Sequence, residues 1–150
     1  MHILTIYCDK KMVTAAIFTA EAAPQCELVV RLVVDEKTQA MSAKVYDKEQ
    51  FRQAACGMSA VPLEKERVPA AGRAGAVDWL VAWLARMGFQ VEHTIIANHM
   101  HGREFREAVG AKIKGSSISG VRRPEALAEW AWHVVESARR HRADLPRLAA

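Results

Sequence analysis

Apolar and polar residues alternate in short runs over the first fifty positions, and this pattern predicts strands. β-prone residues fill 3–6 and 12–18, and the polar trio Asp9-Lys10-Lys11 between them is typical of a hairpin turn. The run 27–34 is rich in valine and nearly continuous, so we expect a third, central strand there. Residues 42–46 predict a fourth strand.

The middle of the chain combines an irregular stretch with a helical pattern. A short helix is expected over 47–55, with Asp47 as its N-cap. Prolines and glycines interrupt 57–75, which predicts a loop with at most one short strand around Val61. An amphipathic helix follows and ends at Gly88, a residue type that terminates many helices. Its apolar stripe comprises Val77, Leu80, Val81 and Leu84.

Helix and strand patterns alternate towards the end of the chain. Residues 91–97 predict a strand whose C-terminal end runs into the polar segment 98–102. We expect a short helix over 104–109, a loop rich in glycine and serine over 110–120, and a helix over 124–142. Early strands followed by helices and a further strand predict a mixed-sheet α/β domain with helices covering the sheet.

Length and composition indicate a single globular domain and argue against a membrane-spanning or exported protein. The chain has 150 residues, of which 51% are apolar and 25% charged, as expected for one globular domain. It has no apolar run of membrane-spanning length, and its first residues lack the basic leader of an export signal. Cys8, Cys26 and Cys56 are odd in number and widely spaced, so we expect reduced thiols in a cytoplasmic protein with no membrane contact.

The basic character of the chain is concentrated at its C-terminus. The net charge is +4, and residues 139–150 hold four arginines against Asp144. Clustered arginines bind anions, so a basic nucleic-acid-binding domain led by this tail is one alternative function. No aromatic residue is interleaved with these arginines to stack on bases. We therefore interpret the tail as a solvated helix end and do not expect nucleic acid as the partner.

Three segments of the chain carry a likeness to a known family. They are Met1-His2-Ile3-Leu4-Thr5-Ile6-Tyr7-Cys8 with the turn and strand that follow, the stretch from Asp78-Trp79-Leu80 through Gly88 to Asn98-His99-Met100-His101-Gly102, and Pro124-Glu125-Ala126-Leu127. In order and spacing they resemble the N-terminal domain of the acetate and propionate kinase family. That family opens with a strand, an Asn-Cys-Gly-Ser-Ser-Ser turn and a strand. It continues through a helix to a strand ending in Gly-His-Arg-Val-Val-His-Gly-Gly.

The resemblance implies a fold and a reaction. The fold is the ribonuclease-H-like mixed sheet of the actin-like ATPase superfamily, with three antiparallel strands at the start, parallel additions and flanking helices. Residues 1–142 would form this single lobe, and 143–150 a basic tail. The family transfers phosphate between ATP and a short carboxylate with magnesium. A second lobe, which we do not find in this sequence, holds most of the family's nucleotide site.

The family's phosphate-binding turn falls on Asp9, Lys10 and Lys11, which the resemblance therefore marks as cofactor-binding positions. The family's asparagine falls on Tyr7, its glycine on Asp9, and its serines on Lys10, Lys11 and Met12. Asp9 brings negative charge to a turn where small residues let backbone N–H groups approach phosphate. We expect no cofactor in isolation, and ATP with magnesium only if a second lobe is supplied.

The substrate-binding candidates are Asn98, His99, His101 and Arg103, for a small carboxylate or phosphate. His101-Gly102 matches the family's His-Gly, which places Asn98 at its substrate-binding arginine. A one-residue gap would instead align Asn98-His99 with the family's His-Arg. The arginine, whose planar fork suits a carboxylate or phosphoryl group, is absent in either alignment, and Arg103 is the nearest replacement in the sequence.

These changes predict a stand-alone lobe without independent kinase activity. It would act as a ligand- or partner-binding protein, or as half of a split kinase that forms acyl phosphate. If active, the enzyme would be a carboxylate phosphotransferase that needs a second lobe. The predicted helices carry two tryptophan pairs, and an exposed pair would suit a homodimer contact or a second kinase lobe. The pairs are Trp79 with Trp83 and Trp130 with Trp132.

The histidines support an alternative class of function. His99 and His101 are two residues apart and project to one side if the strand continues through them, and Glu104 could reach the same place. Such a group would suit a small His-based enzyme or a metal-binding protein. No cysteine pair or third histidine lies at ligand spacing, so we expect no metal.

Overall fold

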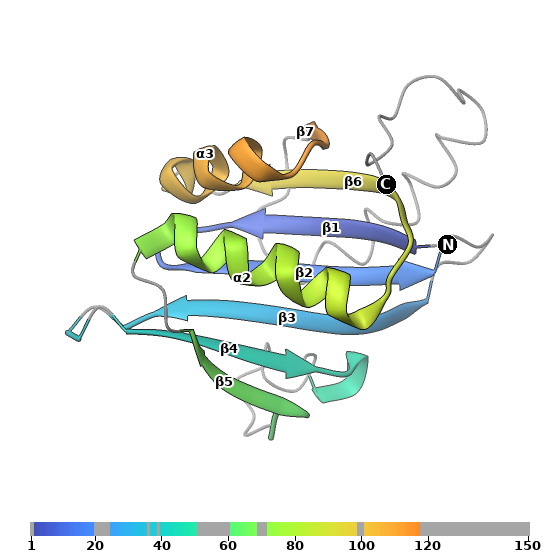
Figure 1. The fold of residues 1–150 in the computed structure, drawn as a ribbon, viewed down its shortest axis with the longest axis horizontal. Helices are drawn as coiled ribbons and strands as arrows, with labels where there is room; N and C mark the ends of the chain where they lie inside the picture. The colour runs from blue at the N-terminus through green and yellow to red at the C-terminus, as the bar shows by residue number, and fades with distance from the viewer. Residues whose placement is uncertain are drawn as a thin grey trace.

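The computed structural model describes residues 2–19, 25–35, 37–38, 40–50, 61–68, 72–98 and 101–117. Within these residues, seven strands form one mixed sheet. Helices α2 and α3 lie on the same face of that sheet (Figure 1). The α/β class and the mixed sheet expected from the sequence are confirmed.

Five strands of the sheet are antiparallel and two are parallel additions. The elements are β1 His2–Cys8, β2 Met12–Thr19, β3 Cys26–Val34, β4 Met41–Tyr46, β5 Glu64–Val68, α2 Gly72–Met87, β6 Val91–Asn98, α3 Arg103–Lys112 and β7 Ser116–Ser117. Their order across the sheet is β5-β4-β3-β2-β1-β6-β7. Neighbours from β5 to β1 are antiparallel, whereas β6 runs parallel to β1 and β7 parallel to β6. Helix α3 makes the crossover between β6 and β7.

The first two strands form the predicted hairpin. Cys8 pairs with Val13, and the Asp9 N–H donates to the Met12 carbonyl at 2.8 Å, which closes the turn at the polar trio. Nearly all residues of both strands are buried, including those whose side chains alternate to the face that α2 and α3 do not cover. β3 is an interior strand, as expected, although β2 rather than β3 holds the middle position of the sheet.

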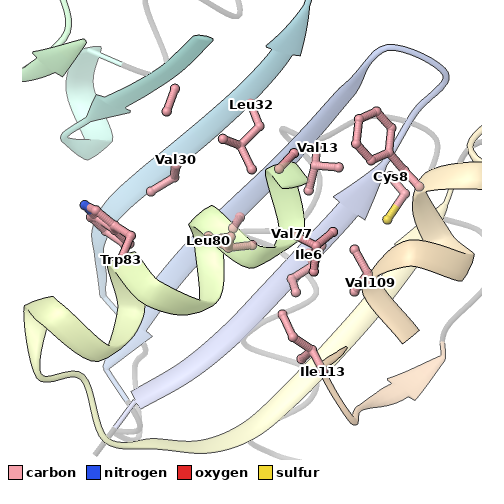
Figure 2. Close-up of a cluster of buried hydrophobic side chains, with 14 of the residues drawn as sticks. Ile6, Cys8, Val13, Val30, Leu32, Val77, Leu80, Trp83, Val109 and Ile113 are labelled. Atoms are coloured by element: carbon pink, nitrogen blue, oxygen red, sulfur yellow. The ribbon is translucent and has the colours of Figure 1, made fainter. Parts of the chain in front are cut away.

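Helix α2 covers one face of the sheet. Val77, Leu80 and Trp83 are at most 1% exposed and lie over the strand side chains (Figure 2). Val81, which the sequence pattern placed in the apolar stripe, is 40% exposed, so that part of the prediction is wrong. At about 100° per residue, Trp83 lies about 60° from Leu80 around the helix axis, whereas Val81 lies about 100° away. Trp79 stacks on Trp83 with ring centroids 6.2 Å apart, so Trp83 belongs to the core and Trp79 is partly buried against it.

The predicted loop over 57–75 contains regular structure, so this prediction is wrong for two segments. Residues Glu64–Val68 form β5, and α2 already begins at Gly72. The sequence pattern misses β5 because four of its five residues are charged and exposed. It misses the first turn of α2 because Gly72 and Gly75 lie in it, and glycine is a poor helix former.

The predictions for the elements after α2 agree better with the structure. The predicted strand over 91–97 is β6, and the predicted helix over 104–109 is α3. Gly88 has a φ of 73° directly after α2, which fits the predicted helix-terminating glycine. The loop predicted over 110–120 is wrong at its start, because α3 continues to Lys112, and also at β7, which pairs with β6.

Asp47 is the N-cap that the sequence predicts. The Gln50 N–H donates to Asp47 Oδ1 at 2.8 Å, and the Asp47 N–H donates to Gln50 Oε1 at 3.1 Å, which is a capping box. The remainder of this predicted helix, over 51–55, lies outside the described residues. So do the predicted helix over 124–142, the basic tail, and the side chains Cys56, Trp130 and Trp132. Neither α2 nor α3 combines the length and the apolar character that a membrane crossing requires.

Candidate functional site

Two groups of residues predicted separately from the sequence lie at one edge of the sheet. Cys8, the last residue of β1, pairs with Asn98, the last residue of β6, so both strands end side by side. The turn formed by residues 9–11 follows β1 directly, and α3 begins at Arg103, shortly after β6 (Figure 1). This junction, formed by the turn 9–11, the end of β6 and the first turns of α2 and α3, is called the edge site below.

Gly102 holds the first turn of α3 against β1. It is the buried N-cap of the helix, and its carbonyl accepts the Arg106 N–H at 2.9 Å. A Cβ added at Gly102 would lie 2.1 Å from the Cys8 carbonyl oxygen and 3.2 Å from the Asp9 Cα. Only glycine permits this approach, so Gly102, the second residue of the His-Gly pair quoted for the family resemblance, has a local structural role.

Arg73 joins the three parts of the edge site. Its Nη2 donates to the Lys10 carbonyl at 3.1 Å, and its Nη1 lies 2.6 Å from Glu104 Oε2. Its guanidinium carbon lies 5.2 Å from the centre of the Phe105 ring, which is fully buried. One guanidinium thus connects the first turn of α2, the turn 9–11 and the first turn of α3.

The sequence predictions miss Arg73. It lies in a segment predicted to be a loop, and its partners Lys10 and Glu104 are distant in the sequence. One signal exists once α2 is known to begin at Gly72, because a cation in the first turn of a helix faces the positive end of the helix dipole. Such an arginine needs an anion, and Glu104 is the anion that the structure places there.

The turn 9–11 uses two of its backbone N–H groups internally. The Lys10 N–H donates to Asp9 Oδ1 at 2.7 Å, and the Asp9 N–H donates to the Met12 carbonyl. The Asp9 carboxylate therefore folds over the turn at the place where a phosphate would meet the backbone. The side chains of Lys10 and Lys11 are exposed and remain as the cationic groups of the turn.

The substrate-binding candidates lie at the end of β6 and around the start of α3. Asn98 ends β6, His101 lies exposed in the turn before α3, and His99 is outside the described residues. The side chain of Arg103 is 85% exposed, and its Nε donates to Glu107 Oε1 at 3.1 Å. Arg103 is thus engaged along its own helix, and the guanidinium within the edge site belongs to Arg73.

The alternative histidine site was expected to include Glu104. The carboxylate of Glu104 contacts Arg73. Within the described ranges, no three His, Cys, Asp or Glu side chains are grouped closely enough to hold a metal ion. Because His99 lies outside those ranges, the paired-histidine prediction stays a prediction.

The thiol at the edge site is kept protonated. Cys8 has no exposed surface, and burial raises the pKa of its thiol to about 12, an effect that Arg106 partly opposes. Burial likewise raises the pKa of Cys26 to about 11. A protonated thiol is a poor nucleophile, so the chemistry that this edge offers is recognition of anions by arginine and lysine.

Comparison of the chain with known proteins gives no independent assignment. Neither the protein-family models nor the curated protein sequences match it. Function is therefore inferred from the fold and from the side chains of the edge site.

Proposed function

We propose that the chain is a lobe similar to the N-terminal domain of acetate kinases, and that it binds a small carboxylate or phosphate at the edge site without phosphotransfer of its own. The strand order supports the ribonuclease-H-like part of this proposal. β1, β2 and β3 are antiparallel, and β6 and β7 are added parallel on the other side of β1. β4 and β5 extend the antiparallel side.

The observation that carries the ligand proposal is the contact between Arg73 and Glu104. Arg73 already binds a carboxylate at 2.6 Å, so its guanidinium is oriented for an anion of that geometry. The side chain of Glu104 is 70% exposed and can turn to solvent, whereas the guanidinium is fixed by the Lys10 carbonyl and the Phe105 ring. A small carboxylate or phosphate would take the place of the Glu104 carboxylate.

The turn 9–11 supports the absence of independent kinase activity. In the family this turn approaches phosphate, but here the Asp9 carboxylate accepts the Lys10 N–H. Tyr7, which stands at the family's asparagine, is 1% exposed and lies within the sheet. Binding of an anion by Arg73 needs neither group. Half of a split kinase is the variant of the proposal in which a second polypeptide supplies the nucleotide lobe.

Titration of the protein with acetate, inorganic phosphate and acetyl phosphate, followed by amide NMR shifts, tests the ligand proposal. We expect the amide signals of 9–11 and 101–104 to move and saturate. Arg73→Ala should weaken the affinity by about tenfold or more, because it removes a charge-assisted pair. Glu104→Gln should strengthen it, because the competing carboxylate is gone.

Arg86→Ala is the matched control for that titration. Arg86 is exposed in the last turn of the same helix, so its removal changes the net charge equally and should leave the affinity unchanged. Equal weakening in Arg73→Ala and Arg86→Ala would indicate general charge attraction. Equal affinity of wild type and Arg73→Ala would refute the site.

A further inference from the structure

β5 is an edge strand that presents charge to solvent. It pairs with β4 on one side and ends the strand order on the other, among the strands that the structure describes. Its first four residues, Glu64, Lys65, Glu66 and Arg67, are all exposed. The open side of an edge strand offers backbone N–H and C=O groups that another extended chain can pair with.

The charges of β5 are sorted by face. Glu64 pairs with Val45 and Glu66 with Ala43, and both partners belong to the core beneath α2. The anionic side chains therefore lie on the helix-covered face of the sheet. Lys65 pairs with Lys44, so the cationic side chains lie on the opposite face, called the second face below.

Cations continue across the second face on neighbouring strands. Arg31 of β3 pairs with Lys44 of β4, which pairs with Lys65 of β5, and Arg67 lies two residues further along β5. Like charges placed directly opposite in a sheet are destabilising. Lys65 and Arg67, at the β5 end of this row, therefore favour an anionic neighbour beyond β5.

A second copy of this chain does not fit the edge in the antiparallel orientation. When two antiparallel strands pair, opposite residues share a face. Two β5 strands would therefore oppose Lys65 and Arg67 to each other on the second face, and Glu64 and Glu66 to each other on the helix-covered face. Every such pair repels, so the alternation of charges selects against antiparallel self-pairing and for an antiparallel strand with the reverse alternation.

Apolar side chains lie beside the same edge. Among the described residues, four large hydrophobic side chains are exposed, and two of them directly precede β5: Val61 at 78% and Leu63 at 54%. Leu63 is held next to β4, because its N–H donates to the Val45 carbonyl at 2.7 Å. Exposed apolar side chains beside a strand that ends the described sheet suit contact with another protein.

We propose that β5 docks an extended segment of a partner protein by strand addition. In the antiparallel orientation the segment carries acidic residues opposite Arg67 and Lys65, cationic or small polar residues opposite Glu66 and Glu64, and an apolar residue beside Leu63. Its order from N- to C-terminus is acidic, cationic, acidic, cationic, apolar. Backbone pairing supplies the attachment, and the alternating charges select the partner and its register.

A synthetic peptide with the core Glu-Lys-Glu-Lys-Leu tests the proposal, and its charged residues sum to zero. Fluorescence anisotropy of the labelled peptide with the intact protein should show saturable binding. The double variant Lys65→Glu/Arg67→Glu should weaken it by about tenfold or more, because two attractive pairs become repulsive. Arg86→Glu/Lys114→Glu makes the same change of charge at exposed positions elsewhere and should bind as wild type does. Circular dichroism checks that both variants are folded.

Two further probes separate strand addition from plain charge attraction. The same peptide with alternate backbone nitrogens methylated keeps every side chain but cannot pair, so it should not bind. A short single-stranded oligonucleotide should bind more weakly than the peptide. Absence of peptide binding, equal binding of the methylated peptide, equal weakening in both double variants, or tighter binding of the oligonucleotide would each overturn the proposal.

Discussion

Gly102 sets how closely α3 approaches β1. The atoms that an added Cβ would meet, at 2.1 Å and 3.2 Å, are backbone atoms of Cys8 and Asp9, which cannot move without disturbing the β1–β2 hairpin. Gly102→Ala should therefore displace α3 and lower the free energy of unfolding by about 1–3 kcal/mol, as overpacking does. Urea unfolding measures the loss, and the amide signals of the edge site should shift with it.

Gly110→Ala is the control within the same helix. A Cβ at Gly110 would meet the Arg106 Nη1 at 2.8 Å, which is the end of a flexible side chain. Alanine is favoured over glycine in a helix by about 0.5–1 kcal/mol, so this variant should be unchanged or slightly more stable. Equal destabilisation by the two substitutions would show that Gly102 is not uniquely restricted.

Cys8 makes the stability of the protein depend on alkaline pH. Its thiol has a pKa of 9.0 in the unfolded reference and of about 12 when folded. As the pH rises above 9, the unfolded chain loses this proton first, so the thiol's contribution is fully present below pH 9 and is lost as the pH rises towards 12. Cys8→Ala should remove about 2 kcal/mol of the fall in unfolding free energy between about pH 8 and about pH 10.5.

Urea unfolding at the two pH values, with wild type and Cys8→Ala side by side, measures this dependence. The comparison is made within each protein, so the packing lost with the sulfur cancels. Cys26→Ala provides a second case, with a smaller expected effect because its pKa rises only to about 11. An identical pH dependence in wild type and Cys8→Ala would contradict the role of the buried thiol.

At the scale of elements, the position of a residue around the axis of α2 determines how much its side chain contributes to the free energy of unfolding. Trp83 is 1% exposed and Val81 is 40% exposed, although both are large and apolar. Trp83→Ala should lower the free energy of unfolding by about 3–5 kcal/mol because it leaves a cavity against the sheet. Val81→Ala should change it by less than about 0.5 kcal/mol. Trp83→Phe, which leaves a smaller cavity, gives an intermediate measurement if the alanine variant does not fold.

The sequence predicts best the strands whose own residues have a strong β-propensity or form a recognisable turn. The hairpin of β1 and β2 has β-prone runs and a polar turn, and the boundaries of β3, β4 and β6 lie within one residue of the predicted ones. The sequence does not predict β5 because four of its five residues are charged and exposed and show no pattern of burial. β7 consists of two serines, which have no strand pattern of their own, and it is a strand because it pairs with β6.

The edge site could be predicted only in part. The turn 9–11 and the segment after β6 were located from the resemblance and from the polar end of a strand, and β1 and β6 do bring these parts together. Arg73 could not be found in this way, because its role depends on three contacts from two distant segments. Arg73 can be recognised as a cation at a helix N-terminus only when the first residue of α2 is known.

At the scale of the whole molecule, we propose that the protein binds an anion but does not transfer phosphate. The edge site holds a guanidinium and two exposed lysines, but the Asp9 carboxylate lies over the turn at which the family approaches phosphate. A nucleotide held by a single lobe would also lack the second wall that excludes water from the reaction. Binding of acetate or phosphate should therefore persist while turnover is absent.

Incubation of the purified protein with acetate, ATP and magnesium should form no acyl phosphate above the blank, as measured by trapping with hydroxylamine. A two-lobed acetate kinase in the same assay confirms that the trap works. Addition of a cell lysate distinguishes the split-kinase variant, because a complementing lobe would produce acyl phosphate that depends on Arg73 and is lost in Arg73→Ala. Acyl phosphate formed by the purified chain alone, and lost with the same substitution, would show instead that the turn still serves catalysis and that one lobe suffices.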